Sequence, residues 1–149
     1  MDRAIYPSLK GRLVVVTGGG SGIGEGMTEA YARQGARVVF LDVAEAPSRA
    51  LEARLAALDP APVFFPCDLT DVDALKACFA AIESEHGPVD VLVNNAANDD
   101  RHEADAVTPA YWDERMTVNL RHQFFAAQAV APAMRRRGGG VILNLGSIS

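Results

Sequence analysis

The chain has 149 residues, of which 49% are hydrophobic and 22% charged, and its 14 basic and 19 acidic side chains give a formal net charge of −5. This length and apolar content predict one domain that buries roughly 70% of its unfolded surface, and they exclude a disordered chain. The acidic balance excludes a nucleic-acid backbone as the main partner. The longest aliphatic run, 13–16, is far shorter than the ~20 residues of a membrane span. No N-terminal stretch resembles a signal peptide, so we expect a cytoplasmic protein without a membrane partner.

Five short aliphatic segments recur along the chain, each flanked by residues typical of turns. They contain Val, Ile, Leu and Phe with little polar alternation, which is the pattern of strands covered on both faces. The predicted strands are 13–17, 38–42, 63–67, 89–94 and 141–144. Cys67 and Cys78 are read as buried thiols, because two cysteines do not make a disulfide framework.

Segments with helical spacing of apolar residues lie between these strands. The predicted helices are 23–34, 48–58, 70–86 and 108–137. Gly35 is expected to end the first helix, and Thr70 and Asp73 have the spacing of a capping box at the start of the third. Pro109 suits the first turn of the fourth helix, whereas Pro132 is expected to kink or interrupt it. The repeated strand–helix alternation predicts an α/β fold with a doubly wound parallel sheet, whose ligands bind beyond the carboxyl ends of the strands.

The end of the first strand carries a glycine-rich loop, TGGGSGIG at 17–24, that opens a helix. Glycines allow the backbone to approach a ligand, and the N–H groups at a helix N-terminus favour a diphosphate. The spacing Gly18-x-x-x-Gly22-x-Gly24 differs from G-x-G-x-x-G, and no Gly-Lys-Ser/Thr follows that would make a P-loop. The alternative is a flexible turn.

Asp42 ends the second strand, 24 residues after Gly18 (42 − 18). A dinucleotide-binding fold places an acidic residue about 20 residues after its first glycine to bind the ribose hydroxyls. A carboxylate would repel a 2′-phosphate, so Asp42 favours NAD over NADP, and Arg37 stands at the wrong end of its strand to reverse this. The alternative role of Asp42 is a loop or cap residue.

Polar residues also follow the other strands. Asp68, after the third strand, is as typical of a helix cap as of a ligand, and Asn94 and Asn95, at the end of the fourth, are explained by turn hydrogen bonds alone. Asn119 is a poor helix former inside a helical stretch, where its side chain could bind backbone or water at a distortion. Ser147, after the fifth strand, is uninformative by itself.

The polar segment 98–103 follows the fourth strand, at the end where a substrate would lie. Its carboxylates and His102 could hold a metal, but nothing fixes the ligand geometry, so a solvated loop is favoured and no metal site is predicted. The loop could also donate and accept hydrogen bonds to sugar hydroxyls. His86 and His122 are read as surface or helix-end residues.

Taken in order, these motifs resemble those of the short-chain dehydrogenase/reductase family, from about residue 9 to residue 149. The matching strings are TGGGSGIG, Asp42, Asp68-Leu69, NNAA at 94–97, Asn119 and NLGS at 144–147. AIYPSLKG, NDDRH, YWDER, NLRH and RRRGGG are similar to bacterial NAD-dependent aldose dehydrogenases, those that oxidise D-xylose first among them. The resemblance implies the strand order 3-2-1-4-5.

The resemblance also implies a role for each matched residue. Glycine-loop residues would hold the diphosphate of NAD, strand-end residues its adenosine and nicotinamide riboses, and two residues would be catalytic. These are Gly18, Ser21, Gly22, Ile23 and Gly24 for the diphosphate; Asp42 for the adenosine ribose; Asp68 and Leu69 for the adenine; Asn95 and Ala96 for the nicotinamide-side ribose; Ser147 for the substrate hydroxyl; and Asn119 for a water in the proton relay. Ala97 and Gly146 depart from the usual family residues, glycine and serine.

The family's catalytic base, the tyrosine of a Tyr-x-x-x-Lys pair, has no convincing counterpart in the chain. Tyr6 and Lys10 have the spacing but precede the first strand, and Tyr111 with Arg115 resembles ordinary helix surface. The expected pair lies beyond Ser149, so residues 1–149 are predicted to be the dinucleotide-binding domain of an incomplete dehydrogenase with little turnover alone.

The implied reaction is hydride transfer from the anomeric carbon of an aldose, D-xylose first, to NAD, which gives a lactone. Two alternatives stay open: a non-catalytic dinucleotide-binding module, and a dehydrogenase of another alcohol, whether another aldose, a steroid or an acyl substrate. The resemblance further implies a homo-oligomer, a dimer or tetramer, that assembles through 108–137.

Overall fold

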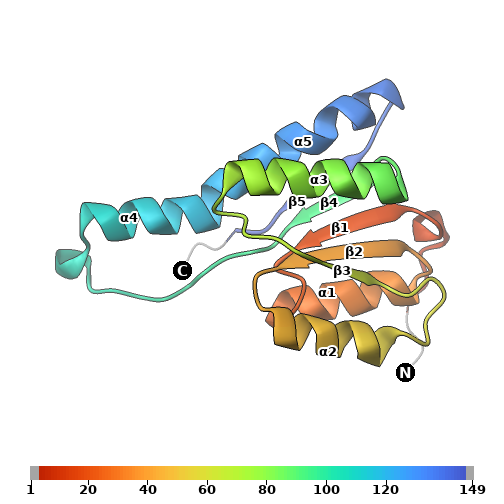
Figure 1. Ribbon diagram of the computed structural model, residues 1–149, viewed down its shortest axis with the longest axis horizontal. Helices are drawn as coiled ribbons and strands as arrows, with labels where there is room; N and C mark the ends of the chain where they lie inside the picture. The colour runs from red at the N-terminus through yellow and green to blue at the C-terminus, as the bar shows by residue number, and fades with distance from the viewer. Residues whose placement is uncertain (1–3, 147–149) are drawn as a thin grey trace.

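Five parallel strands form the centre of the molecule, in the spatial order β3-β2-β1-β4-β5 (Figure 1). The strands are β1 (Leu13–Thr17), β2 (Arg37–Asp42), β3 (Val63–Pro66), β4 (Val91–Asn94) and β5 (Val141–Asn144). The computed structural model describes residues 4–146. It confirms the doubly wound parallel sheet and its strand order. Because the strands are parallel and in register, Thr17, Asp42 and Asn94 all reach the same edge of the sheet.

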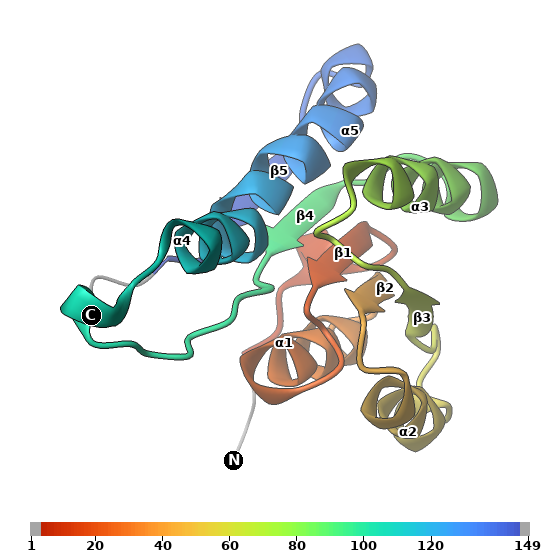
Figure 2. The same cartoon turned by 60° about the vertical axis from the view of Figure 1, so that its left-hand side comes forward.

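Helices cover both faces of the sheet (Figure 2). On one face lie α1 (Gly22–Arg33) and α2 (Glu45–Leu55), and on the other lie α3 (Val72–His86) and α5 (His122–Arg136). Before α5 come α4 (Pro109–Met116) and a π-helical turn, Thr117–Arg121. Short 3₁₀ turns occur at Pro7–Leu9 and Ala104–Ala106.

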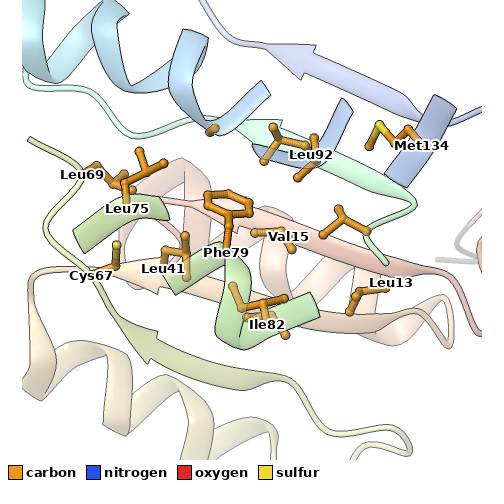
Figure 3. Close-up of a cluster of buried hydrophobic side chains, with 14 residues drawn as sticks. Leu13, Val15, Leu41, Cys67, Leu69, Leu75, Phe79, Ile82, Leu92 and Met134 are labelled. Carbon is orange, nitrogen blue, oxygen red and sulfur yellow. The ribbon is translucent and has the colours of Figure 1, made fainter. Parts of the chain in front are cut away.

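Two apolar clusters, one on each face, fill the space between helices and sheet. Along β1, Leu13 and Val15 belong to the cluster under α3 and α5 (Figure 3), whereas Val14 and Val16 belong to the cluster under α1 and α2. Adjacent strand residues point to opposite faces, so a strand buried on both must be apolar throughout. This explains the continuous aliphatic runs of the sequence.

The second helix begins earlier than the sequence predicted, at Glu45 instead of residue 48, and ends at Leu55 instead of 58. An Asp42 carboxylate oxygen accepts a hydrogen bond from the Ala44 N–H at 2.9 Å, which turns the chain into the helix directly after β2. Ser48 lies in the helix, fully buried, and its hydroxyl donates to the Ala44 carbonyl.

The predicted capping box at Thr70 is wrong, because α3 begins two residues later. Its N-cap is Asp71, whose carboxylate accepts hydrogen bonds from the N–H groups of Asp73 and Ala74. Thr70 instead donates its hydroxyl to Asp68 at 2.7 Å. An aspartate next to a threonine offers a second cap of equal quality, and sequence spacing alone does not separate them.

The predicted helix 108–137 is interrupted, but at the π-helical turn and not at Pro132. Helix α5 continues through Pro132; Val130, Ala133 and Met134 on both sides of it are buried, and Val130 and Met134 belong to the apolar cluster on the sheet. This packing offsets the backbone hydrogen bond that a proline removes. The π turn falls at Asn119, where the sequence indicated a distortion.

Two elements are incompletely covered. Every residue of β5 is exposed, and α4 extends past the end of the sheet (Figure 1). In the part of the chain that the structure describes, no helix has both the length and the apolar character needed to cross a membrane.

Candidate functional site

The glycine loop packs closely against itself and against the segment after β4. Gly18 has φ +63°, and a Cβ there would lie 2.7 Å from the Cα of Ala96. A Cβ on Gly24 would lie 1.9 Å from the Gly18 carbonyl oxygen. Both distances are too short for real atoms, so only glycine fits either position. The loop is therefore closely packed at these two positions, which favours a shaped binding loop over a flexible turn.

The outer surface of the same loop is open. Ser21, Gly22 and Ile23 are exposed at the N-terminus of α1, and a Cβ on Gly22 would meet nothing within 4 Å. Ser21 is the N-cap residue, yet its side chain makes no capping hydrogen bond. The first N–H groups of a helix have no partner within the helix, so this end of α1 is suited to binding an anion.

Asp42 lies beside the glycine loop, at the end of the neighbouring strand. Its Oδ2 accepts a hydrogen bond from the Gly20 N–H at 2.9 Å, while Oδ1 accepts from Ala44. A Cβ on Gly20 would lie 3.0 Å from that Oδ2 and 2.1 Å from the Ser48 hydroxyl. Because Gly20 has no side chain, the Asp42 carboxylate can lie in direct contact with the glycine loop. Arg37, at the other end of β2, donates instead to the His86 carbonyl.

Asn95 joins the glycine loop to the end of β4. Its amide nitrogen donates to the carbonyl oxygens of Thr17 and Gly18 at 3.0 and 3.1 Å. In return, the Thr17 hydroxyl accepts from the backbone N–H groups of Asn95 and Ala96. The side-chain amide of Asn95 is therefore engaged with backbone, and Ala96 packs against the core.

Asp68 and Leu69 follow β3 with opposite exposure. The Asp68 carboxylate is exposed, and hydrogen bonds from the hydroxyl and backbone N–H of Thr70 lower its pKa. Leu69 is 9% exposed and belongs to the apolar cluster under α3. Asp68 thus has a carboxylate facing outward at this edge, whereas the Leu69 side chain packs inward.

Asn119 holds the segment after β4 from the π-helical turn. Its Oδ1 accepts from the Asn98 N–H at 2.7 Å, and its Nδ2 donates to the Asn98 carbonyl at 3.0 Å. The Asn119 carbonyl in turn accepts from the Gln123 side chain. Ser147 lies outside the described residues.

Two buried polar residues near this edge were not singled out correctly from the sequence. The Asn94 amide donates to the Asn144 side chain at 2.8 Å and ties β4 to β5. His122, expected at the surface or at a helix end, is the first residue of α5 and is fully buried, and burial lowers its pKa. Its Nδ1 lies 2.6 Å from the Val118 carbonyl, so that nitrogen carries the proton. The buried positions Ala126 and Val130 follow it at intervals of four, which is the signal that could have revealed its burial.

The loop 98–103 is held by α4. The His102 ring stacks on Tyr111 with centroids 3.9 Å apart, and the Tyr111 hydroxyl donates to the Asp100 carbonyl. The Arg115 guanidinium lies over the Tyr111 ring and pairs with the Asp100 carboxylate at 3.3 Å. Tyr111 is therefore a packing residue and not ordinary helix surface. Within residues 4–146, no three His, Cys, Asp or Glu side chains gather as metal ligands would.

Tyr6 and Lys10 lie far from this edge. The Tyr6 backbone N–H donates to the side chain of Gln34, at the C-terminal end of α1. Lys10 is beside the next residue, because a Cβ added at Gly35 would lie 3.4 Å from the Lys10 Cγ. The glycine loop is at the other end of that helix.

A parallel sheet of this order, with a glycine loop entering a helix and an acidic residue ending the next strand, is the arrangement of a doubly wound nucleotide-binding domain. The model of the family described as short chain dehydrogenase matches residues 12–149, and the chain belongs to this family of oxidoreductases. Members bind a nicotinamide dinucleotide and act on small molecules.

Named relatives refine the comparison. D-xylose 1-dehydrogenase of Caulobacter vibrioides is 62% identical over the whole chain, which covers 58% of that protein. The protein named "Probable galactose dehydrogenase GalD" of Rhizobium meliloti is 53% identical over 97% of the chain and 57% of its own length. A metagenomic short-chain oxidoreductase solved in complex with NADP has a TM-score of 0.87 and 34% identity, with 95% of this chain and 65% of that one covered. The chain thus spans somewhat more than half the length of these curated relatives.

Proposed function

We propose that these residues form the nucleotide-binding part of an NAD-dependent dehydrogenase that oxidises the anomeric hydroxyl of an aldose, D-xylose first, to a lactone. The observation that carries the proposal is Asp42, whose carboxylate stands against the glycine loop through the Gly20 N–H. A 2′-hydroxyl can donate to this carboxylate, whereas a 2′-phosphate would meet a like charge. We propose this activity for the complete protein and not for residues 1–149 alone.

The open surface of the glycine loop fits the dinucleotide. Gly18, Ser21, Gly22, Ile23 and Gly24 would hold the diphosphate at the N-terminus of α1. Asp68 and Leu69 would flank the adenine, and Asn95 and Ala96 would lie along the nicotinamide-side ribose. Because the Asn95 side-chain amide already donates to backbone carbonyl oxygens, Asn95 would contact the ribose through its backbone. When bound, NAD supplies the hydride acceptor.

The remaining chemistry is removal of a proton from the sugar hydroxyl. Ser147 would orient that hydroxyl and stabilise the developing negative charge on its oxygen. Asn119 would hold a water of the relay by which the proton leaves, and its side chain fixes the loop at Asn98. A Tyr-x-x-x-Lys pair outside residues 1–149 would supply the base, with the ammonium lowering the pKa of the phenol.

The loop 98–103 is the proposed sugar-binding segment. Its Asp99 and Arg101 side chains are exposed, while Asp100 and His102 are held by α4. A polyol needs several fixed polar partners, and a loop anchored at two points can supply them. The two sugar-named relatives support an aldose over a steroid or acyl substrate.

The test uses the product of the complete reading frame and the 149-residue chain in parallel. The complete protein is expected to reduce NAD with D-xylose faster than with a hydrophobic alcohol, and the shorter chain to bind NADH with little turnover. Preference for the hydrophobic alcohol would refute the substrate class. Nucleotide binding without turnover of any alcohol would favour a non-catalytic binding module, and ordinary turnover by the shorter chain would refute the need for an external base.

We also propose that the protein forms a dimer or tetramer, and that the helical arm of residues 109–124 takes part in the interface. Trp112, Met116, Leu120 and Phe124 recur every four residues and are 60%, 38%, 54% and 63% exposed. Such a stripe of large apolar side chains along one helical arm is typical of a protein interface. Leu120→Asp is expected to lower the molecular mass measured by sedimentation, while Arg135→Asp, at the far end of α5, should leave it unchanged. An unchanged mass for Leu120→Asp would refute the arm as interface.

A further inference from the structure

The Gln123 side chain lies where three elements meet: the π-helical turn, the end of β4 and the end of β5. Gln123 is the second residue of α5 and is half-buried. Its Nε2 donates to the Asn119 carbonyl at 3.0 Å and to the Leu145 carbonyl at 3.4 Å. Its own backbone carbonyl accepts a hydrogen bond from the Asn94 side-chain amide at 3.3 Å. The proposed dehydrogenase chemistry gives Gln123 no role.

Two consecutive side chains hold the carbonyls of the π-helical turn. His122 Nδ1 lies 2.6 Å from the Val118 carbonyl oxygen, and Gln123 Nε2 reaches the next carbonyl, that of Asn119. A π-helical turn is a rare backbone arrangement that occurs frequently at functional sites. Because the side chains that follow the turn bind its carbonyls, they help to fix the position of Asn119.

The backbone of Leu145, two residues before Ser147, is held on both sides. Its N–H donates to the Asn94 carbonyl at 2.9 Å, and its carbonyl accepts from Gln123. The Asn94 side chain is fully buried and donates both to the Asn144 side chain and to the Gln123 carbonyl. Asn94, Gln123 and Leu145 thus form a closed set of hydrogen bonds that ties the start of α5 to the chain as it leaves β5.

We propose that Gln123 is a positioning residue for the proton relay, because it fixes Asn119 relative to the end of β5, from which the chain continues to Ser147. The Asn119 side chain extends the same connection to the backbone of Asn98, at 2.7 and 3.0 Å. Proton transfer requires groups within hydrogen-bond reach, so a small displacement on either side of Gln123 lowers its rate. Since its Nε2 donates to backbone carbonyls, Gln123 acts through Asn119 and not on the substrate. This inference rests on the proposed function.

Stopped-flow kinetics of the complete protein with D-xylose and NAD test the proposal. Gln123→Met keeps the length and helix propensity of the side chain but removes the donor, and Gln128→Met is the matched control at an exposed position of α5. We expect Gln123→Met to lower the single-turnover rate of NADH formation about 10-fold, with the KM for D-xylose nearly unchanged. The solvent deuterium isotope effect on this rate should rise, because proton transfer becomes slower. Gln128→Met should match the wild type.

Affinity for NADH separates a positioning role from a general loss of structure. The glycine loop is held by Asn95 and Thr17, so Gln123→Met should bind NADH as the wild type does. Gln123→Glu sets carboxylate oxygens against two carbonyl oxygens and should lower the rate at least as far. Equal rates for Gln123→Met and Gln128→Met would overturn the proposal. So would a lower rate with weaker NADH binding and an unchanged isotope effect.

Amide hydrogen exchange of the same proteins tests the connection without turnover. The Asn98 N–H donates to Asn119, so it should exchange several-fold faster in Gln123→Met than in the wild type. The Gly20 N–H, which donates to Asp42, should exchange at an unchanged rate. Unchanged exchange at Asn98 would overturn the proposal. A wild-type protein that does not turn over D-xylose would overturn the proposed function, and the exchange rates would still decide whether Gln123 positions Asn119.

Discussion

Replacing Asp42 by alanine should reverse the proposed preference for NAD over NADP. The change removes a charge-assisted hydrogen bond to the ribose, which costs about 1.5–3 kcal/mol of NAD affinity. It also removes repulsion of a 2′-phosphate. At 4 Å this repulsion is about 4 kcal/mol for an effective dielectric of 20, and the half-buried position of Asp42 reduces it to about 1–2 kcal/mol. The two effects together predict a shift in the NADP-to-NAD affinity ratio of about 100-fold or more.

The assay is a fluorescence titration of the complete protein with NADH and with NADPH. Asp42→Ala also leaves the Gly20 and Ala44 N–H groups without their acceptor, so Asp42→Asn, which retains one acceptor oxygen, separates charge from loop support. Asp90→Ala is the control, because it removes one carboxylate at the opposite edge of the sheet, where Asp90 binds the Leu13 N–H. An unchanged affinity ratio in Asp42→Ala would refute the assignment of the ribose position.

Three other predictions test separate parts of the structure. Gly24→Ala should lower the free energy of unfolding by about 2–4 kcal/mol in chemical denaturation, because the added Cβ would overlap the Gly18 carbonyl. Gly26→Ala, in the same helix, is the control: its added Cβ meets nothing within 4 Å, so it should raise the free energy of unfolding by about 0.5–1 kcal/mol. Similar stabilities for the two variants would contradict the packed loop. Burial lowers the pKa of His122 below its usual 6.5, so on acidification the unfolded chain binds a proton before the folded protein does. The free energy of unfolding should therefore fall as the pH drops below about 6.5. His122→Gln should make the free energy of unfolding less dependent on pH in this range. A wild-type curve that is flat between pH 7 and pH 5 would contradict it. Asp99→Ala should raise the KM for aldoses with little change in kcat, and unchanged KM values for every aldose tested would exclude Asp99 from sugar binding.

The sequence was sufficient for the sheet because its signal is local and repeated. The central strands β1, β2 and β4 are buried on both faces, so aliphatic runs mark them, and parallel pairing brings the carboxyl ends of the strands to one edge. The sequence alone therefore predicts that Asp42 and the glycine loop lie together. The distortion at Asn119 was also predictable, because asparagine is a poor helix former in an otherwise helical stretch.

The sequence predictions were wrong or incomplete where neighbouring residues were equally good helix caps, or where contacts between residues distant in the sequence determine the structure. Asp71 and Thr70 are both good caps, and only the observed hydrogen bonds choose between them. The Asn94–Asn144 pair joins residues 50 apart and depends on the register of β4 and β5. Pro132 stays within α5 because its buried neighbours hold the helix against the sheet, which a rule for isolated helices does not include.

The hydrogen bonds that join Thr17, Gly18 and Asn95 affect how much conformational entropy the glycine loop would lose when a ligand binds. These hydrogen bonds hold the glycine loop to β4 through contacts within the protein itself. A loop that is already ordered loses little conformational entropy when it closes around a diphosphate, so more of the contact energy remains as affinity. We therefore expect that removal of the Asn95 amide would loosen the loop and so weaken the proposed nucleotide binding.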